Sequence, residues 1–439
     1  MPDGGAAAAR PQIFSLPPAP SASSSARGLV LELFAGIGGG SYALRAAGLP
    51  DSDLAHTILF ETDPACVLVL QSNLLGQHVS LSDARAPNGQ VSCATAFSDG
   101  PFHQVTGLLQ RFPNVDSILV VGGSPCQGFS RANQAPLGLE DPRSCLVYVF
   151  AVIVARLRAG LAALGRSSAV VNFLVENVQM PSAYSDPISE LLGVQPLNIC
   201  ASTISPARRD RLYWTSLPGT QQAPLEQVDL TPDDVLDPGW APAWVRLLPD
   251  EVGTTADRWH LPTRPWAPGL PPECPTRCWS FGPRMYGPHH LAINDDTAAS
   301  ILDDLTAHFA PGSYTSARRA AFIEDIHTGS LGQWVRPLRP HELERALGYP
   351  EGASDFSGPA SAVDFDNDIP RELGRCARLA NGFSVPVVSG LLRSWVEALL
   401  NSTSPPCTPG PEPLGRGPRA ICRTDALITL LPGGLGRLG

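Results

Sequence analysis

The most conspicuous absence from the 439-residue sequence is lysine, because all 31 basic residues are arginine. The 41 acidic residues leave a formal net charge of −10, which excludes binding of nucleic acid through a general coating of basic side chains. A GC-rich genome accounts for the arginine preference and for the many Ala, Pro and Gly residues. If this chain binds a polyanion, it must do so in a locally basic cleft.

Long apolar runs are also missing. No stretch reaches the roughly 18 to 20 uninterrupted apolar residues of a membrane helix. The longest candidate, Leu146–Ala155, stops at Arg156 and Arg158, and we expect a buried helix there. The sequence therefore predicts no membrane partner.

The ten cysteines show neither the pattern of a disulfide framework nor the paired spacing of a zinc ribbon. Cys274 and Cys278 lie close together, but no second Cys or His pair accompanies them. We expect reduced thiols and no bound metal, which leaves a thiol free to act as a nucleophile.

Both ends of the chain are predicted to be tails, the first of them disordered. Residues 1–28 are rich in Ala, Pro and Ser, and residues 401–439 in Pro and Gly. The first tail faintly resembles an organelle transit peptide, because it holds Arg10, Arg27 and a single acid, but it shows no amphipathic period.

Between the tails, short apolar runs alternate with helical patterns, which predicts an α/β fold with a doubly wound, mostly parallel sheet. This domain is expected to comprise 29–217 and 334–400, while 218–333, rich in Pro and Trp, forms a smaller irregular domain. Asp141-Pro142 is expected to begin one helix and Gly160 to end it. The predicted strands are Leu29–Phe34, Thr57–Phe60, Ser117–Val121, Val170–Val175 and Arg211–Thr215, and later helical patterns cover Pro340–Leu347 and Ser384–Leu400.

A glycine-rich loop, Phe34–Gly40, follows the first predicted strand and precedes a helix. Its glycines permit a tight turn and the close approach of a ligand to backbone N–H groups. Glu61 lies 25 residues beyond Gly36 (61 − 36), where an acid accepts hydrogen bonds from ribose hydroxyls in nucleotide-binding folds. The loop is not G-x-G-x-x-G, which counts against a dinucleotide. Asp83, after a third candidate strand, suits an adenine amino group, although a surface or capping role fits equally well.

Cys126 lies in another glycine-rich turn, Gly122–Ser130, directly after the predicted strand Ser117–Val121. With 45 prolines and 10 cysteines, about one Pro-Cys pair is expected by chance, and Pro406-Cys407 is a second one. The dipeptide alone is therefore uninformative. What indicates a ligand site is the position at the carboxyl end of a buried strand.

Charged residues follow or precede the next strands. Glu176 ends an apolar run, where a carboxylate is costly unless it is paired or functional, and an N-cap is the alternative. Arg209 and Arg211 would share one face of a strand as paired donors for a phosphate or carboxylate, and a solvated basic edge is the alternative. The glycine loop, Glu61, Cys126 and Glu176 should thus gather on one rim of the sheet.

Taken in order, these segments resemble the DNA (cytosine-5) methyltransferase family over about 29–217 and 334–400. Pro275-Thr276-Arg277 and the ending Phe383–Val387 are most similar to animal de novo methyltransferase catalytic domains, whereas Gln127–Phe129 is more similar to bacterial members. The segments that carry the resemblance are Leu33–Gly39, Ser124–Ser130, Gly138–Arg143, Glu176–Val178, Arg209–Arg211, Arg336–Pro350 and Asn381–Val388.

This resemblance implies an S-adenosylmethionine-dependent enzyme that methylates cytosine in double-stranded DNA. The thiolate of Cys126, oriented by Pro125, would attack C6 of a flipped-out cytosine while Glu176 stabilises protonated N3. Arg211 and Arg209 would hold the cytosine carbonyl and lower the thiol pKa. Asn177 belongs to the same implied catalytic set. The implied cofactor-site residues are Phe34, Ala35, Gly36, Ile37, Gly38, Gly39, Glu61, Asp83, Leu146, Asn381, Phe383 and Ser384.

Residues 218–333 would form the far wall of the cleft and read the flanking DNA sequence. The implied DNA contacts are Ser130, Arg277, Arg284, Arg318 and Arg319, of which the last two fit a solvated helix face equally well. The resemblance also implies a nuclear location, with an organelle as the alternative, and leaves open a homo-oligomer or an accessory subunit.

Two rival functions are consistent with the same fold. A tRNA cytosine-5 methyltransferase of the DNA-methyltransferase-like type typically shows Pro-Pro-Cys and Cys-Phe-Thr; here Ser124 precedes Pro125 and Cys-Phe-Thr does not occur. A catalytically dead accessory subunit would have lost Cys126 or Glu176, and both are present.

Overall fold

The computed structural model describes residues 26–75, 79–82, 102–129, 137–220, 225–226, 228–243, 279–280, 291–294, 334–356 and 371–401. Apart from 26–28 and 401, both predicted tails lie outside these residues. The predicted domain boundaries remain predictions.

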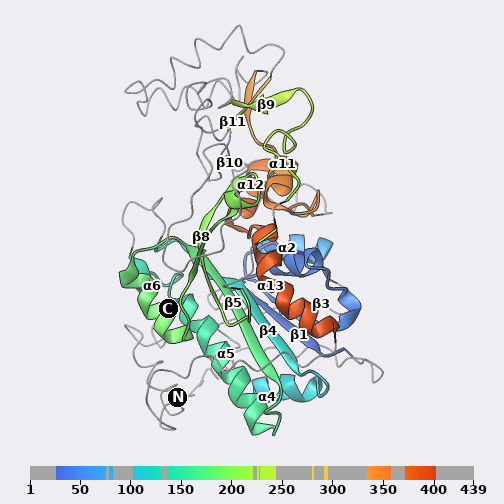
Figure 1. Ribbon diagram of the computed structural model, residues 1–439, viewed down its shortest axis with the longest axis vertical. Helices are drawn as coiled ribbons and strands as arrows, with labels where there is room; N and C mark the ends of the chain where they lie inside the picture. Colours follow the sequence, from blue (N-terminus) through green and yellow to red (C-terminus); the bar gives the residue numbers. More distant parts are fainter. Residues whose placement is uncertain are drawn as a thin grey trace, which may run out of the picture.

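A seven-stranded sheet forms the centre of the larger part of the molecule (Figure 1). Its strand order is β3-β2-β1-β4-β5-β8-β6, and its strands run parallel except β8, which is antiparallel to both neighbours. The mostly parallel sheet predicted from the apolar runs is confirmed. The strands are β1 (Gly28–Leu33), β2 (Leu54–Phe60), β3 (Val79–Ser82), β4 (Ser117–Gly123), β5 (Val170–Val178), β6 (Leu197–Cys200) and β8 (Asp210–Thr215).

Each of the five predicted strands is present, and each extends beyond the predicted bounds at one end. The sequence does not predict β6, whose four residues Leu-Asn-Ile-Cys are too few to show a period. The other strands could be predicted from the sequence because they are buried. The strands β1, β2 and nearly all of β4 are buried, so their sequences are almost continuously apolar.

Helices cover both faces of the sheet, which confirms the doubly wound architecture. On one face, α1, α2, α11 and α13 share a core cluster with the sheet. On the other face, α4, α5 and α6 form a second cluster. The helices are α1 (Gly39–Ala46), α2 (Pro64–Asn73), α4 (Phe102–Arg111), α5 (Leu146–Ala163), α6 (Ser182–Leu192), α11 (Pro340–Leu347), α12 (Arg371–Asn381) and α13 (Val385–Leu400).

The bounds predicted for α5 are wrong at both ends. Asp141 is not the N-cap of α5, which is Cys145; its carboxylate accepts hydrogen bonds from the backbone N–H of Arg143 (2.8 Å) and from that residue's guanidinium (2.9 Å). Gly160 is buried within α5, and the helix ends before Gly165, whose φ of 68° is left-handed. The expected buried helix is nevertheless present. Although α5 is long and apolar enough to cross a membrane, its buried residues belong to a core cluster, and the helix packs on α4 and β5.

The strand order places a crevice where ligands bind in such sheets. From β1 the sheet continues through β2 in one direction and through β4 in the other. The helices that follow β1 and β4 cover opposite faces, so the chain diverges at the carboxyl ends of these two strands. This topological switch point is the usual ligand site of an open α/β sheet.

A smaller three-stranded antiparallel sheet lies beyond α11, at the top of Figure 1. Arg336 of its strand β12 stacks on the ring of Trp240 in β9, 4.1 Å from the centroid, and donates two hydrogen bonds of 2.7 Å to Glu342. Glu342 lies in α11 and also accepts from the backbone N–H of Asp237 and Arg339. A buried ion pair thus joins the small sheet to α11. The strands of this sheet are β9 (Trp240–Pro242), β11 (Leu291–Asn294) and β12 (Val335–Pro337), and a separate two-stranded sheet pairs β7 (Ala207–Arg208) with β10 (Trp279–Ser280).

Replacing Glu342 by Ala should lower the free energy of unfolding by about 3–5 kcal/mol, because the buried guanidinium of Arg336 loses its partner. Urea titration followed by circular dichroism measures this loss. The matched control is Glu226→Ala, which removes the partner of Arg393 in an exposed ion pair and should change stability little. Equal losses in the two variants would contradict the role assigned to Glu342.

Candidate active site

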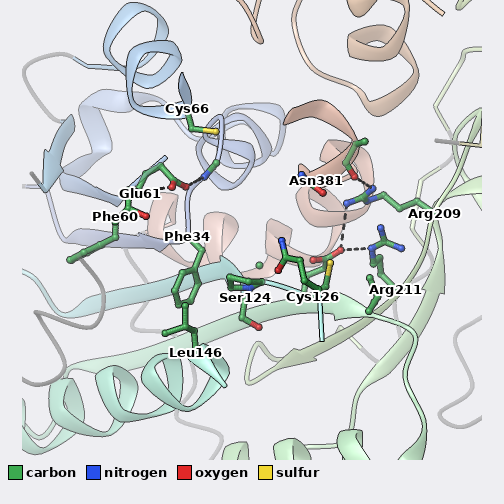
Figure 2. A pocket seen from close by; sticks show the side chains of 18 residues that line it. Phe34, Phe60, Glu61, Cys66, Ser124, Cys126, Leu146, Arg209, Arg211 and Asn381 are labelled. Carbon is green, nitrogen blue, oxygen red and sulfur yellow. Dashed lines mark hydrogen bonds and ion pairs between the residues drawn. The ribbon is translucent and has the colours of Figure 1, made fainter. Parts of the chain in front are cut away.

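One pocket of about 270 Å³ opens at the carboxyl ends of the central strands (Figure 2). Gly36, Glu61, Cys126 and Glu176, which the sequence places at successive strand ends, line it together. The predicted gathering of these residues on one rim is therefore observed. The lining residues are Phe34, Gly36, Phe60, Glu61, Thr62, Cys66, Gly123, Ser124, Pro125, Cys126, Gln127, Leu146, Glu176, Val178, Arg209, Arg211, Ala380 and Asn381.

The loop after β1 has a left-handed backbone at three positions, Phe34 (φ 55°), Gly36 (φ 54°) and Gly38 (φ 86°). A non-glycine residue such as Phe34 rarely adopts this conformation, and such strain is typical of functional sites. At Gly38 a Cβ would lie 2.1 Å from Cδ1 of Leu74, so glycine is required there by packing as well as by backbone angle. The glycines therefore shape a turn beneath the pocket.

Glu61 follows β2 and is fixed against this loop (Figure 2). Its carboxylate accepts hydrogen bonds from the backbone N–H groups of Gly36 (2.7 Å), Thr62 (2.6 Å) and Asp63 (2.8 Å). Burial raises the pKa of Glu61, while the three N–H donors oppose that rise. The result is a preorganised acceptor in the pocket wall.

A second carboxylate, Glu32, supports the loop from below and was not anticipated from the sequence. It is buried in β1 and accepts hydrogen bonds from Gly40 N (2.7 Å), Ser41 N (2.9 Å) and Ser41 Oγ (2.7 Å). Burial raises its pKa to about 7. The available signal was a single acid within the apolar run Leu29–Phe34, which is costly unless that acid is hydrogen-bonded.

The turn that carries Cys126 is held by the neighbouring strand. Gly123 of β4 pairs with Glu176 of β5, and a Cβ on Gly123 would lie 3.1 Å from Oε2 of Glu176. Asn177 is buried and donates from Nδ2 to Ser124 O (3.2 Å) and Ser124 Oγ (2.9 Å). Asn177 therefore positions the nucleophile turn and does not itself line the pocket.

Two arginines surround the carboxylate of Glu176. Its Oε1 lies 2.8 Å from Nε of Arg211 and 3.9 Å from Nη2 of Arg209, yet it accepts no well-aligned hydrogen bond within the described structure. Arg209 is only 5% exposed and donates from Nη1 to Ala380 O (2.8 Å). The alternative of a solvated basic edge is therefore wrong, and the carboxylate that the pair was expected to bind is that of Glu176.

Comparisons with known proteins agree with this geometry. Residues 29–180 match the family model described as C-5 cytosine-specific DNA methylase. This match spans the cofactor loop, Cys126 and Glu176. Over residues 29–180, about a third of its length, the chain is therefore similar to the C-5 cytosine-specific DNA methylases.

A curated relative, type II methyltransferase M.AquIA of Picosynechococcus sp., is 30% identical over 125 residues, which amount to 28% of this chain and 42% of the relative. The chain therefore spans less than half the length of this relative. Two solved structures are also similar. A mutant of Spodoptera frugiperda DNMT2 has 17% identity and a TM-score of 0.47, and the match covers 84% of this chain and 99% of that one. Entamoeba histolytica methyltransferase EhMeth has 14% identity and a TM-score of 0.42, with 86% and 98% covered.

The pocket has two ends (Figure 2). Glu61, Phe60 and Cys66 lie at one end, and Cys126, Arg209 and Arg211 lie at the other. Three predicted cofactor residues line it as well, namely Phe34, Leu146 and Asn381.

Other predicted cofactor residues do not line the pocket but lie next to residues that do. Ala35 and Ile37 point into the core, and Gly38 and Gly39 form the turn and the start of α1. Phe383 and Ser384 are buried next to the pocket without lining it, and Ser384 Oγ has no hydrogen-bond partner in the described structure. Asp83, Ser130, Arg277, Arg284, Arg318 and Arg319 lie outside the described residues.

The sequence assigned no role to several residues of the wall. Thr62 follows Glu61 directly, and Cys66 lies in the first turn of α2, which begins beside the pocket. Ala380 arrives from the last turn of α12. Ser124 and Gln127 in the Cys126 turn, and Val178 beside Glu176, carried a signal, since they lie within segments that the sequence already marked.

Outside the pocket, two carboxylates and a histidine form a cluster whose acidic groups are paired with arginine side chains. Asp237, His341 and Glu342 lie close enough together to suit a metal ion. However, Arg336 occupies both oxygens of Glu342, and Arg345 lies 3.2 Å from Asp237. Their negative charge is thus already compensated by cations of the protein itself.

The expectation that the arginines lower the thiol pKa of Cys126 is only half correct. Burial raises the pKa above 9.0, and Glu176 adds to the rise, while Arg211 and Arg209 lower it. The net shift is upward, because desolvation of the thiolate outweighs the attraction of two arginines that Glu176 already neutralises.

Alkylation of Cys126 should consequently become steadily faster with pH and reach no plateau below about pH 9, because only the thiolate reacts. Glu176→Gln should accelerate alkylation at pH 8 and Arg211→Gln should slow it, since the two changes remove charges of opposite sign. Iodoacetamide labelling, quantified by mass spectrometry of the Cys126 peptide, separates this thiol from the others. Shifts of the same sign in both variants would refute the electrostatic account.

Proposed function

We propose that the protein is a DNA (cytosine-5)-methyltransferase that transfers a methyl group from S-adenosylmethionine to C5 of a cytosine in double-stranded DNA. The observation that carries this proposal is that Cys126 and Glu176 line the same pocket as Glu61 and the glycine loop. A nucleophile, a base-binding acid and a ribose acceptor thus share one space. Similarity to the methylase family over residues 29–180 supports the same substrate class.

The residues at the Glu61 end fit the cofactor. Gly36 lines the pocket, and the position of its missing Cβ has open space around it, which allows a ligand to approach the backbone. Glu61 presents a fixed carboxylate suited to ribose hydroxyls. Phe34 and Leu146 supply apolar walls, and Asn381 a polar one. When bound there, S-adenosylmethionine supplies an electrophilic methyl group.

At the other end of the pocket, side chains supply the nucleophile for C6 and the partner for N3 that the weakly nucleophilic C5 of cytosine requires. The Cys126 thiolate forms a bond to C6, and the electron pair of the C5–C6 double bond moves toward C5. Glu176 stabilises the proton on N3 as charge develops on the ring. Once C5 carries the methyl group, the C5 proton passes to water, its electron pair re-forms the C5–C6 double bond, and the S–C6 bond breaks to release the Cys126 thiolate. Arg211, beside Glu176, offers donors to the cytosine carbonyl.

The position of Cys126 supports base flipping. Cys126 is half-buried and lines a pocket at the strand ends, which a base stacked in a duplex does not enter. Extruding the cytosine costs a few kcal/mol, which contacts to the flipped base offset. We further propose that residues 218–333 contribute the DNA contacts outside the pocket, including Arg277 and Arg284.

A DNA substrate also supports our proposal of a nuclear location and an epigenetic role, with an organelle as the alternative site. Fractionation of cells that express the tagged full chain tests the location. Recovery only in fractions without DNA would contradict it.

Incubating the full chain with tritiated S-adenosylmethionine should label unmethylated duplex DNA. Cys126→Ser should abolish labelling because an alkoxide is not available to attack C6, while cofactor binding stays near the wild-type level. Glu176→Gln should lower kcat by about 10²–10³, because the side chain loses the charge that stabilises protonated N3.

Labelling of tRNA in place of DNA would contradict the proposed substrate, and no labelling of either would contradict the activity. Full activity of Cys126→Ser would contradict the mechanism. Cys145→Ser, which makes the same chemical change at a free cysteine that does not line the pocket, is the matched control and should retain labelling.

A further inference from the structure

The two glycine turns of the site meet at one aromatic ring. A Cβ added to Gly39, at the end of the cofactor loop, would lie 3.0 Å from Cδ2 of Phe383. A Cβ added to Gly123, before the nucleophile turn, would lie 3.0 Å from Cε1 of the same ring. Because neither glycine has a side chain, the ring of Phe383 packs directly on both backbones. Its position therefore affects the spacing between the cofactor loop and Cys126.

The hydroxyl of Tyr349 holds the backbone of Phe383. The N–H of Phe383 donates to Tyr349 Oη at 3.0 Å. The same oxygen lies 2.7 Å from the position of a Cβ on Gly39 and 2.6 Å from that of a Cβ on Gly382. Tyr349 thus contacts the cofactor loop and the segment after α12 at once. Burial raises its pKa, so the phenol stays neutral and the hydroxyl remains intact at physiological pH.

Local backbone structure directs Tyr349 to this place. Gly348 caps α11 with a left-handed φ of 79°, and the helix ends with Tyr349 N donating to Glu344 O at 2.8 Å. Tyr349 is 4% exposed and packs edge-on against Tyr42 of α1, with ring centroids 5.5 Å apart. Its side chain is therefore locked by packing and does not line the pocket.

We propose that Tyr349 is a positioning residue of this methylase, whose hydroxyl acts through Phe383 to set the cofactor loop against the nucleophile turn and so determines cofactor affinity. This inference rests on the proposed function. Without the hydroxyl, the buried N–H of Phe383 loses its acceptor, and an unpaired buried donor favours a shifted backbone. Asn381 lines the pocket two residues earlier, so a shift of this segment moves the cofactor wall directly.

Tyr42 provides a matched control. It is 7% exposed and touches the same ring of Tyr349, but its hydroxyl makes no hydrogen bond within the described structure. Tyr349→Phe and Tyr42→Phe therefore each remove one phenol oxygen, from two rings that lie next to each other. Only the first deletion removes a partner of Phe383.

The test measures binding of S-adenosylhomocysteine to the full chain by calorimetry, together with the melting temperature and with the KM for DNA. Tyr349→Phe should raise the Kd for S-adenosylhomocysteine about five- to tenfold and leave the KM for DNA unchanged. Tyr42→Phe should leave all three quantities near the wild-type values. Phe383→Leu, which shortens the ring contact with Gly39 and Gly123, should raise the Kd in the same way.

An unchanged Kd in Tyr349→Phe, with or without a lower melting temperature, overturns the inference, because the tyrosine would then be merely structural. Equal increases in Tyr349→Phe and Tyr42→Phe also overturn it. Failure of the wild-type chain to bind S-adenosylhomocysteine contradicts the proposed function itself, so the two failures are distinguishable.

Discussion

The site depends on one buried electrostatic contact, the ion pair between Glu176 and its two arginines. A carboxylate that is 6% exposed would be costly at the end of a hydrophobic strand if no cation accompanied it. Arg211 lies at the beginning of β8, not at its end, yet it reaches the same rim as the residues that follow β1, β2 and β4. This is possible because β8 runs antiparallel to β5, with Arg211 in register with Val178. Inverting a single strand therefore brings cations to a rim otherwise built from strand ends.

The same contact explains the electrostatics of the nucleophile. Arg209 and Arg211 are close enough to lower the pKa of Cys126, but Glu176 takes up much of their charge and burial dominates the remainder. In the free protein, these effects favour the neutral, protonated form of the Cys126 thiol. A base that engages Glu176 would redirect the arginines, so thiolate formation would be coupled to occupancy of the pocket. With such coupling, the reactive thiolate would form only when the target base is bound.

Much of this architecture could be predicted from the sequence, for reasons that differ between elements. The buried strands β1, β4 and β5 are continuous apolar runs, and the residues that matter follow their carboxyl ends. By contrast, the antiparallel direction of β8 leaves no mark in a strand of only six residues. The start of α5 was misplaced because Asp141-Pro142 has the sequence of a helix start, whereas the aspartate binds Arg143 instead. Tyr349 and Glu32 act through backbone N–H groups of distant or neighbouring turns, and such partners are not visible in a residue pattern.

The covalent bond between Cys126 and C6 is the central claim, and trapping it is the most direct test. Duplex DNA in which the target cytosine carries fluorine at C5 has no C5 proton to lose, so the adduct cannot resolve after methyl transfer. With S-adenosylmethionine present, the wild-type chain should form a complex that survives denaturing electrophoresis, and peptide mapping should locate the DNA on Cys126. An adduct that persists in Cys126→Ser, or its absence from an active wild-type enzyme, would contradict the account.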